Sequence, residues 1–230
     1  MRQGSPTRPV TPSLRGVSVP AMLFGSRGHS WPPRFSRTDP EGVTHAVLDR
    51  PELVLCAVDE LLADCWREVA EKRQGIRPHR GSVFDLEVDA VVSPANSFGW
   101  MRGGIDAQYS RVFPQVEQNV RSAVLTFHGG ELPVGEAIVV PTGVEEPRWL
   151  ISAPTMRDPG EQLPADTINP YLAARAVLRL WREGRTPSGP LPDVVRSIAM
   201  PGLGTGVGGV DPRTCARQVA AAWDETFITV

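Results

Sequence analysis

The sequence predicts an α/β domain in which a mixed central sheet is covered by helices. Two observations carry this prediction. From Val43 onward, short apolar segments alternate with segments of helical periodicity, and the most apolar segments have the continuous character of strands buried on both faces. Glycine and proline are also frequent, at 22 and 23 of 230 residues. A coiled coil or a simple helical bundle is therefore excluded.

The first part of this alternation predicts two strands and one helix. Residues 53–58 are a strand candidate. Asp59 follows them and can cap a segment whose apolar residues fall at helical spacing until Gly75. Residues 90–92 form the second strand candidate, and their continuous apolar character is typical of a central strand.

The second part of the chain continues the same alternation. Helical periodicity, Gly and Pro positions and short apolar runs mark each element. We expect helices at residues 107–112 and 115–127, strands at 137–140 and 149–153, a helix opened by Asn169-Pro170, a strand at 194–200 and a helix at 211–227.

Charge divides the chain into two parts. Residues 1–38 contain six arginines and no acidic residue, although the formal net charge of the chain is −2. We expect a flexible leader rich in Arg, Pro and Ser over residues 1–42, followed by a single domain over residues 43–230. The arginines offer salt-dependent attraction to nucleic acid or an acidic partner, and a disordered tail or a misassigned start is the alternative. Outside this leader, nothing indicates a nucleic-acid partner.

The cysteines and the hydropathy pattern argue against a disulfide-rich, zinc-binding, membrane-spanning or secreted protein. Cys56, Cys65 and Cys215 are odd in number and lack CxxC spacing, which argues against a disulfide framework and a zinc site. The longest apolar run, residues 53–58, is too short to span a bilayer, and no cleavage site follows residues 17–24. We expect a cytoplasmic protein with no membrane partner, no metal and no cofactor.

Two loops carry the functional signal. Residues 93–106 (the first glycine loop) and residues 201–209 (the second glycine loop) each follow a buried strand and lead toward a helix. Ligands of α/β sheets bind at the carboxyl ends of strands, and glycine N–H groups at a helix N-terminus approach anions closely. The pair predicts a site that holds a pyrophosphate from both sides, whereas either loop alone would be read as a tight turn. Neither loop is a Walker or a Rossmann motif.

Three ordered motifs also point to a known family. Residues 81–96 are similar to its opening segment, its Val-Asp-Ala-Ile-Val strand and its Ala-Ala-Asn, and residues 103–106 are similar to the Gly-Gly-Val-Asp of a hydrolytic branch. Residues 200–209 are similar to its second phosphate loop. The chain thus resembles the macrodomain family of ADP-ribose-binding proteins and ADP-ribosylhydrolases over residues 76–230, which implies a three-layer α/β/α fold. Residues 43–75 are expected to add a strand and a helix beside that core.

The resemblance assigns roles to individual residues. It implies that Asn96 orients the distal ribose and that Asp106 activates or positions the attacking water, with a pKa raised by the bound diphosphate. From the residues alone, Asn96 could equally be a turn residue and Asp106 a helix N-cap. The implied catalytic residues are Asn96 and Asp106, and the implied ligand-binding residues are Asn96, Ser82, Val83, Gly103, Gly104, Ile105, Pro201, Gly202, Gly204, Thr205, Gly206, Val207 and Gly208.

The sequence departs from the family pattern at several positions. Ser82 replaces an aspartate that accepts from the adenine amino group, and Asp85 either compensates or ends a turn. Gly208 replaces an aromatic residue that covers the distal ribose, which implies a wider pocket. A further macrodomain branch hydrolyses its substrate through a lysine adduct. Lys72 is the only lysine of this chain and lies before the first motif, which argues against that mechanism.

The resemblance implies a mono-ADP-ribosylhydrolase with water as the nucleophile. Its substrate would be ADP-ribose on protein side chains, first of all on carboxylate esters, so its partner is ADP-ribose or an ADP-ribosylated protein. Two alternatives remain open. One is a non-catalytic ADP-ribose reader, and the other is a hydrolase of a small derivative such as ADP-ribose-1''-phosphate or O-acetyl-ADP-ribose.

Overall fold

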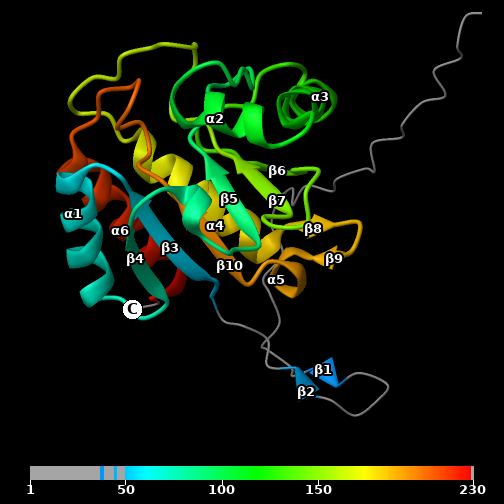
Figure 1. Ribbon diagram of the computed structural model, residues 1–230, viewed down its shortest axis with the longest axis horizontal. Helices are drawn as coiled ribbons and strands as arrows, with labels where there is room; N and C mark the ends of the chain where they lie inside the picture. Colours follow the sequence, from blue (N-terminus) through cyan, green and yellow to red (C-terminus); the bar gives the residue numbers. More distant parts are fainter. Residues whose placement is uncertain (1–36, 39–43, 46–49, 229–230) are drawn as a thin grey trace, which may run out of the picture.

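The computed structural model describes residues 37–38, 44–45 and 50–228. The expected leader over residues 1–42 lies outside the described residues, apart from β1 (Arg37–Thr38). This strand pairs in antiparallel fashion with β2 (Thr44–His45). The remaining elements form a six-stranded sheet, a separate short hairpin and the surrounding helices (Figure 1).

A six-stranded sheet forms the centre of the fold. Its order is β4-β3-β10-β5-β7-β6, and every neighbouring pair is parallel except β6 with β7. The predicted mixed sheet is therefore confirmed. The strands are β3 (Glu52–Ala57), β4 (Ile76–Arg80), β5 (Ala90–Ser93), β6 (Ile138–Pro141), β7 (Trp149–Ser152) and β10 (Ser197–Met200).

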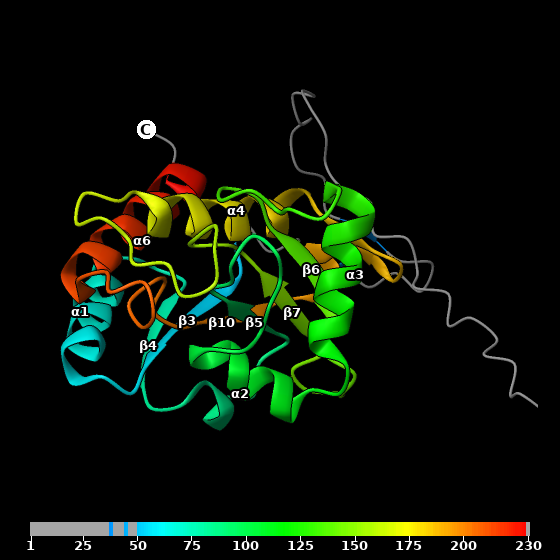
Figure 2. The same ribbon diagram turned by 90° about the horizontal axis from the view of Figure 1, so that it is seen from above.

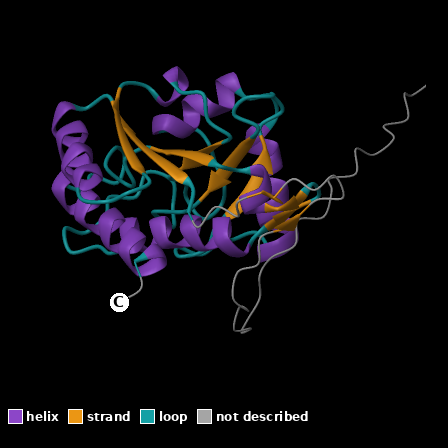
Figure 3. Cartoon of the chain, turned by 90° about the horizontal axis from the view of Figure 1, so that it is seen from below, coloured by secondary structure: helices purple, strands orange, loops and turns teal. Residues whose placement is uncertain are grey.

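Helices cover this sheet and make the fold a three-layer α/β/α arrangement, as the sequence predicts. α4 and α6 lie on one face and α2 on the opposite face (Figure 2), and helices surround the strands when the molecule is seen from below (Figure 3). α1 packs against α6, β3 and β4, and α3 packs against the edge strand β6. The helices are α1 (Glu60–Glu71), α2 (Gly104–Val112), α3 (Val116–His128), α4 (Asn169–Glu183), α5 (Leu191–Val194) and α6 (Pro212–Phe227), with a 3-10 turn η1 (Val83–Asp85) and a short hairpin of β8 (Arg185–Thr186) and β9 (Gly189–Pro190).

Capping residues fix where helices begin beside the strand ends. The Asp59 carboxylate accepts from the Leu62 N–H at 2.8 Å, directly after β3. Asp211 accepts in the same way from the Thr214 N–H at 2.9 Å at the start of α6. Each cap satisfies a backbone donor that the first turn leaves unpaired. Both predicted helix starts are confirmed.

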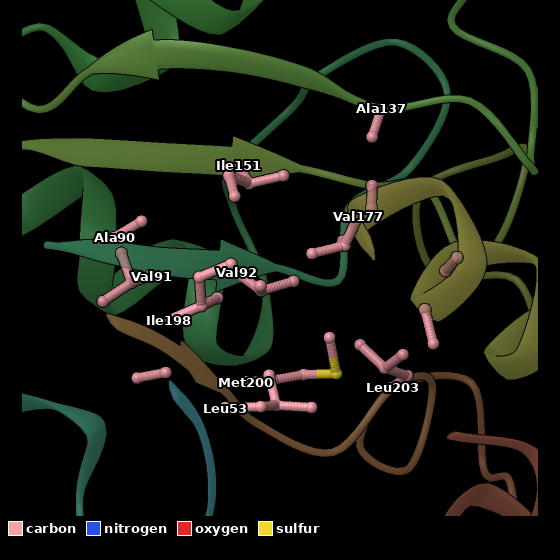
Figure 4. Packing of buried hydrophobic residues seen from close by; sticks show 14 of the residues in the cluster. Leu53, Ala90, Val91, Val92, Ala137, Ile151, Val177, Ile198, Met200 and Leu203 are labelled. Atoms are coloured by element: carbon pink, nitrogen blue, oxygen red, sulfur yellow. The ribbon is translucent and has the colours of Figure 1, made fainter. Parts of the chain in front are cut away.

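The core includes side chains from every strand of the central sheet and from the helices around it, and part of it lies between the sheet and α4. Side chains from the central strands and from α4 gather in one layer there, as Figure 4 shows for Leu53, Val92, Ile198 and Val177. All four are fully buried. Burying such a side chain contributes about 1.5–3 kcal/mol, which holds the strand ends, and the loops that follow them, in fixed positions.

The strand and the helix expected within residues 43–75 are β3 and α1. β3 lies inside the sheet between β10 and β4, with Leu53 paired to Ile198 on one side and to Ile76 on the other. The sequence did not predict this interior position of β3. β4 escaped the sequence reading because its residues, Ile-Arg-Pro-His-Arg, are mostly polar and exposed, as suits an edge strand.

Membrane-spanning helices and metal-site clusters are absent from the part of the chain that the structure describes. No helix there is long and apolar enough to pass through a bilayer. No cluster of His, Cys, Asp and Glu side chains there has the composition of a metal site. Cys56, Cys65 and Cys215 are free and buried. The two glycine loops remain the features on which a ligand site rests.

Candidate functional site

A pocket of about 760 Å³ lies at the carboxyl ends of β3, β4, β5 and β10. Both glycine loops contribute to its wall, as expected for a ligand site of an α/β sheet. Every candidate site residue except Gly208 lines it. The lining candidates are Ser82, Val83, Asn96, Gly103, Gly104, Ile105, Asp106, Pro201, Gly202, Gly204, Thr205, Gly206 and Val207.

Asn96 shapes the first glycine loop. Its side-chain oxygen accepts from the N–H groups of Phe98 and Trp100, both at 3.2 Å, and its amide nitrogen donates to the Trp100 carbonyl at 2.7 Å. Gly99 completes the turn with φ +70°, and a Cβ there would lie 2.8 Å from Val120. The structure thus gives Asn96 the turn role. Because Asn96 also lines the pocket, its contact with a ribose stays a prediction.

Asp106 is a buried carboxylate in the first turn of α2. Gly103, not Asp106, is the N-cap of this helix, so the N-cap alternative for Asp106 is wrong. The Asp106 Oδ1 accepts from the Ser93 hydroxyl at 2.7 Å. Burial raises the pKa of Asp106 to about 7, the Ser93 hydrogen bond lowers it and the Glu117 charge raises it. A raised pKa was expected from a bound diphosphate, but here the protein alone raises it.

The N-terminus of α2 faces the same pocket. Gly104, Ile105 and Asp106 all line it, and the first N–H groups of a helix have no partner within the helix. Such groups, together with the helix dipole, favour an anion. Gly104 has φ +55°, a conformation that a residue with a side chain adopts only at a cost. This end of the pocket is therefore suited to a phosphate group.

Hydrogen bonds with distant segments hold the second glycine loop in its conformation. The Leu203 N–H donates to the Cys215 Sγ at 3.4 Å. The Gln162 amide donates to the Val207 carbonyl, and the Leu163 N–H donates to the Gly208 carbonyl at 2.9 Å. Within the described residues, the N–H groups of residues 204–208 have no acceptor. These donors remain available to an anion at the loop.

Gly208 supports the second glycine loop from outside the pocket. A Cβ at this position would lie 2.7 Å from the Gly204 carbonyl oxygen and 3.0 Å from Leu163. Only a residue without a side chain allows this approach. The structure thus gives Gly208 a packing role in place of the expected pocket-lining role.

The Macro domain family profile matches residues 92–219 of this chain. The chain belongs to the macrodomain family. The matched region contains both glycine loops, the helices α2, α3, α4 and α5, and the first half of α6. It begins after β3 and β4, which complete the sheet of this macrodomain and provide one wall of its pocket.

The relatives of this macrodomain have different names, and not all of them have an assigned activity. An uncharacterized protein of Aeropyrum pernix is 35% identical over 144 residues, which are 62% of this chain and 67% of the relative. A DNA ADP-ribosyl glycohydrolase of Thermus aquaticus is 30% identical over 132 residues, 57% of this chain, but the match spans only 33% of that relative. An O-acetyl-ADP-ribose deacetylase of Salmonella gallinarum is 30% identical over 152 residues, 65% of this chain and 77% of the relative.

Solved structures of other macrodomains have a fold similar to that of this chain. The macrodomain of Mycobacterium tuberculosis DarG has a TM-score of 0.51 and 25% identity, covering 64% of this chain and 88% of that one. The Oceanobacillus iheyensis macrodomain with ADP has a TM-score of 0.51 and 19% identity, covering 63% and 72%. The second similarity, at its low identity, concerns the fold alone.

The loop after β7 contributes to the pocket of this macrodomain and was missed from the sequence. Met156, Pro159 and Gly160 line the pocket, as do residues 56–59 at the carboxyl end of β3. The signal was present in both cases, because the loop after β7 follows a predicted strand and is rich in Pro and Gly, whereas residues 56–59 end a predicted strand.

Asp85 does not line the pocket, although Ser82 does. The Asp85 Oδ2 accepts from the Ser82 N–H at 2.9 Å, and the Ser82 hydroxyl accepts from the Phe84 N–H at 3.2 Å. This capping box ties Asp85 to the start of η1. Asp85 therefore ends a turn, as the second of its two interpretations holds. Asp59, the cap of α1, is the carboxylate that lines the Ser82 end of the pocket.

Two arginines stack on Trp100 at the edge of the pocket. The Cζ of Arg102 lies 4.2 Å and that of Arg121 3.5 Å from the centre of the Trp100 ring. Arg102 lies 3.9 Å from Glu117. Trp100 also lines a second cavity, of about 710 Å³, on α3. The two guanidinium groups thus stand between the candidate site and a groove beside it, whereas Met101 is buried as a packing residue.

Lys72 lies away from the pocket. It ends α1 as the C-cap, and it is absent from the residues that line the pocket. Since it is the only lysine of the chain, the pocket of this macrodomain contains no amine side chain of that kind. The argument against a lysine adduct is therefore strengthened.

Proposed function

We propose that this macrodomain binds ADP-ribose and hydrolyses its bond to a macromolecular acceptor. The observation that supports this proposal most is the state of Asp106. Its carboxylate is buried at the N-terminus of α2, and burial raises its pKa to about 7. A general base works best when its pKa lies near the operating pH. The two glycine loops beside it supply backbone donors suited to a diphosphate.

In the proposed reaction, each group of the pocket has one task. The N–H groups of residues 103–105 and 204–207 bind the diphosphate, and Asn96 orients the distal ribose. Ionised Asp106 accepts a proton from a water molecule as the water oxygen bonds to the anomeric carbon. The bond from that carbon to the acceptor breaks, and the acceptor leaves with the bonding electron pair. A carboxylate acceptor leaves without needing a proton.

The acceptor that we propose first is a carboxylate ester on a protein side chain. DNA-linked ADP-ribose is the second candidate, favoured by the name of the Thermus aquaticus relative and by the position of Arg102 and Arg121. Guanidinium groups at the edge of the pocket attract phosphates of a nucleic-acid strand. Rates on protein-linked, DNA-linked and O-acetylated ADP-ribose, measured side by side, assign the acceptor.

The central test replaces Asp106 with alanine. We expect Asp106→Ala to lower kcat/KM by roughly 10²- to 10⁴-fold, the usual contribution of a general base, while calorimetry shows ADP-ribose still bound. In the unsubstituted protein, kcat/KM should fall as the pH drops below about 7. An Asp106→Ala variant as fast as the unsubstituted protein contradicts the assignment. Binding without turnover on any substrate makes the protein a reader.

Domain boundaries belong to the same proposal. We propose that the domain over residues 43–230 binds ADP-ribose without the leader over residues 1–42, because the lining residues in the described part of the chain, from Cys56 to Val207, already enclose the pocket with both glycine loops. Deletion of residues 1–38 should leave the Kd for ADP-ribose unchanged. A large loss of affinity would give the leader a part in binding.

A further inference from the structure

Ser93 is held rigidly behind the pocket. It is the last residue of β5, and this strand pairs with β10 on one side and β7 on the other. Only 1% of Ser93 is exposed, and it is not among the residues that line the pocket. Its hydroxyl is therefore not placed to attack a substrate. It can act only through a neighbour.

That neighbour is Asp106. The Ser93 Oγ donates to the Asp106 Oδ1 at 2.7 Å, a short distance typical of a hydrogen bond to a carboxylate. Within the described residues, the Asp106 Oδ2 has no hydrogen-bond partner, and Asp106 lines the pocket. The strand end thus occupies one carboxylate oxygen and leaves the other for the pocket.

We propose that Ser93 is the positioning residue of Asp106, which holds Oδ1 so that Oδ2 is the oxygen offered to the attacking water. The proposal rests on the proposed hydrolytic function. It goes beyond it because neither the family resemblance nor the motif spacing assigns a role to Ser93. A carboxylate fixed by a rigid strand needs no reorganisation when the substrate binds.

The charged and titratable groups around Asp106 make Ser93 important for its ionisation. Burial disfavours the carboxylate, and the negative charge of Glu117 on α3 disfavours it further. Tyr109, on the same helix as Asp106, donates its hydroxyl to the Val92 carbonyl at 3.2 Å, and Cys56 on β3 has a pKa raised by burial to about 12. Neither group supplies a positive charge. The Ser93 hydrogen bond is the interaction that favours ionised Asp106.

The test compares two buried serines. Ser93→Ala removes the donor, and Ser152→Ala is the matched control. Ser152 lies opposite Ser93 on β7, is also 1% exposed and makes no hydrogen bond to Asp106. Ser93→Thr keeps the hydroxyl and should restore the original behaviour. Each variant is measured for kcat and KM from pH 5 to 9, and for the Kd of ADP-ribose.

We expect the acid limb of kcat to move upward by about one pH unit or more in Ser93→Ala, as loss of a hydrogen bond to a charged group implies. The rate should therefore fall roughly tenfold at pH 6 and recover at pH 9, with a Kd for ADP-ribose unchanged within about twofold. Ser152→Ala should leave the limb in place. An unmoved limb in Ser93→Ala, or an equal shift in both serine variants, overturns the proposal.

A second measurement separates this proposal from the hydrolytic function. Carboxyl NMR of isotope-labelled protein reports the pKa of Asp106 without turnover. A higher Asp106 pKa in Ser93→Ala than in the unsubstituted protein supports the coupling even where no substrate is hydrolysed, in which case only the hydrolase assignment fails. An Asp106 pKa that is equal in the two proteins contradicts the positioning role, whatever the activity.

Discussion

The two glycine loops line the same pocket, but different kinds of hydrogen bond hold each loop in its conformation. The turn of the first glycine loop is formed by a local side chain, since Asn96 bonds to the backbone of Phe98 and Trp100, although the backbone at Ala95 and Ser97 also bonds to distant segments. The second glycine loop is fixed from outside by Gln162 and Leu163, about 45 positions away in the chain. The first loop also contains the titrating group. The first glycine loop, whose turn is formed by a local motif, thus contains the proposed general base. The second glycine loop is shaped as an anion site by contacts from distant segments.

The largest expected effect concerns the carboxylate of the first glycine loop. Asp106 titrates at about 7 in the folded protein and near 3.9 when unfolded, so its contribution to stability is present below about pH 4 and lost as the pH rises through 7. Asp106→Asn keeps an acceptor for Ser93 and does not titrate. We expect it to raise the free energy of unfolding at pH 8 by up to about 4 kcal/mol.

Urea unfolding at pH 4 and pH 8 measures this difference. The gain of Asp106→Asn should shrink to below about 1 kcal/mol at pH 4, where the folded state of the unsubstituted protein carries the proton and the unfolded state carries it about half of the time. Asp59→Asn, at an exposed helix cap, is the control for the aspartate-to-asparagine change and should not raise the free energy of unfolding at pH 8. A variant that is less stable than the unsubstituted protein at pH 8 would contradict the raised pKa.

The next effect tests the external support of the second glycine loop. Gly208→Ala places a Cβ 2.7 Å from the Gly204 carbonyl oxygen, whereas a Cβ at Gly206 meets nothing within 4 Å. We expect Gly208→Ala to lower the free energy of unfolding by about 1–3 kcal/mol, the usual cost of overpacking, and to weaken ADP-ribose binding. Gly206→Ala should be close to neutral in stability. Thermal unfolding of the pair decides, and equal stability would refute the close-packed position of Gly208.

The smallest expected effect removes one side chain that holds the second glycine loop. Gln162→Ala deletes the donor to the Val207 carbonyl, a hydrogen bond worth about 1 kcal/mol. We expect an ADP-ribose affinity several-fold weaker by calorimetry, with kcat little changed because Asp106 is untouched. Gln118→Ala, at an exposed position of α3, is the matched control. An equal loss in both variants would show that the loop keeps its shape without Gln162.

The difference between the loops also explains how far the sequence could be read. Caps such as Asp59 and Asp211 act within three residues, so the helices that they start could be predicted. Asn96 acts within four residues, and its turn role was one of two stated interpretations. Gln162 and Leu163 act on residues about 45 positions along the chain, and Ser93 acts on Asp106 at the other end of the first glycine loop. No local pattern marks a partner at these separations.

For Asp106, too, some properties could be predicted from the sequence and others could not. Its place after Gly103-Gly104 was evident, and its site role was expected from motif spacing. Its N-cap alternative failed because Gly103 takes that position, and the cause of its raised pKa is burial by surrounding elements. Burial is a property of the assembled fold and is not encoded at any one position.

The central position of β3 has a consequence for biosynthesis. Its neighbour β10 comes from residues 197–200, so Leu53 and Ile198 cannot pair until most of the chain has been translated. Pairings between such distant segments form slowly because a long loop must close first. The strand ends that carry the pocket wall belong to both segments. The complete pocket wall therefore forms only after β10 and the second glycine loop have left the ribosome.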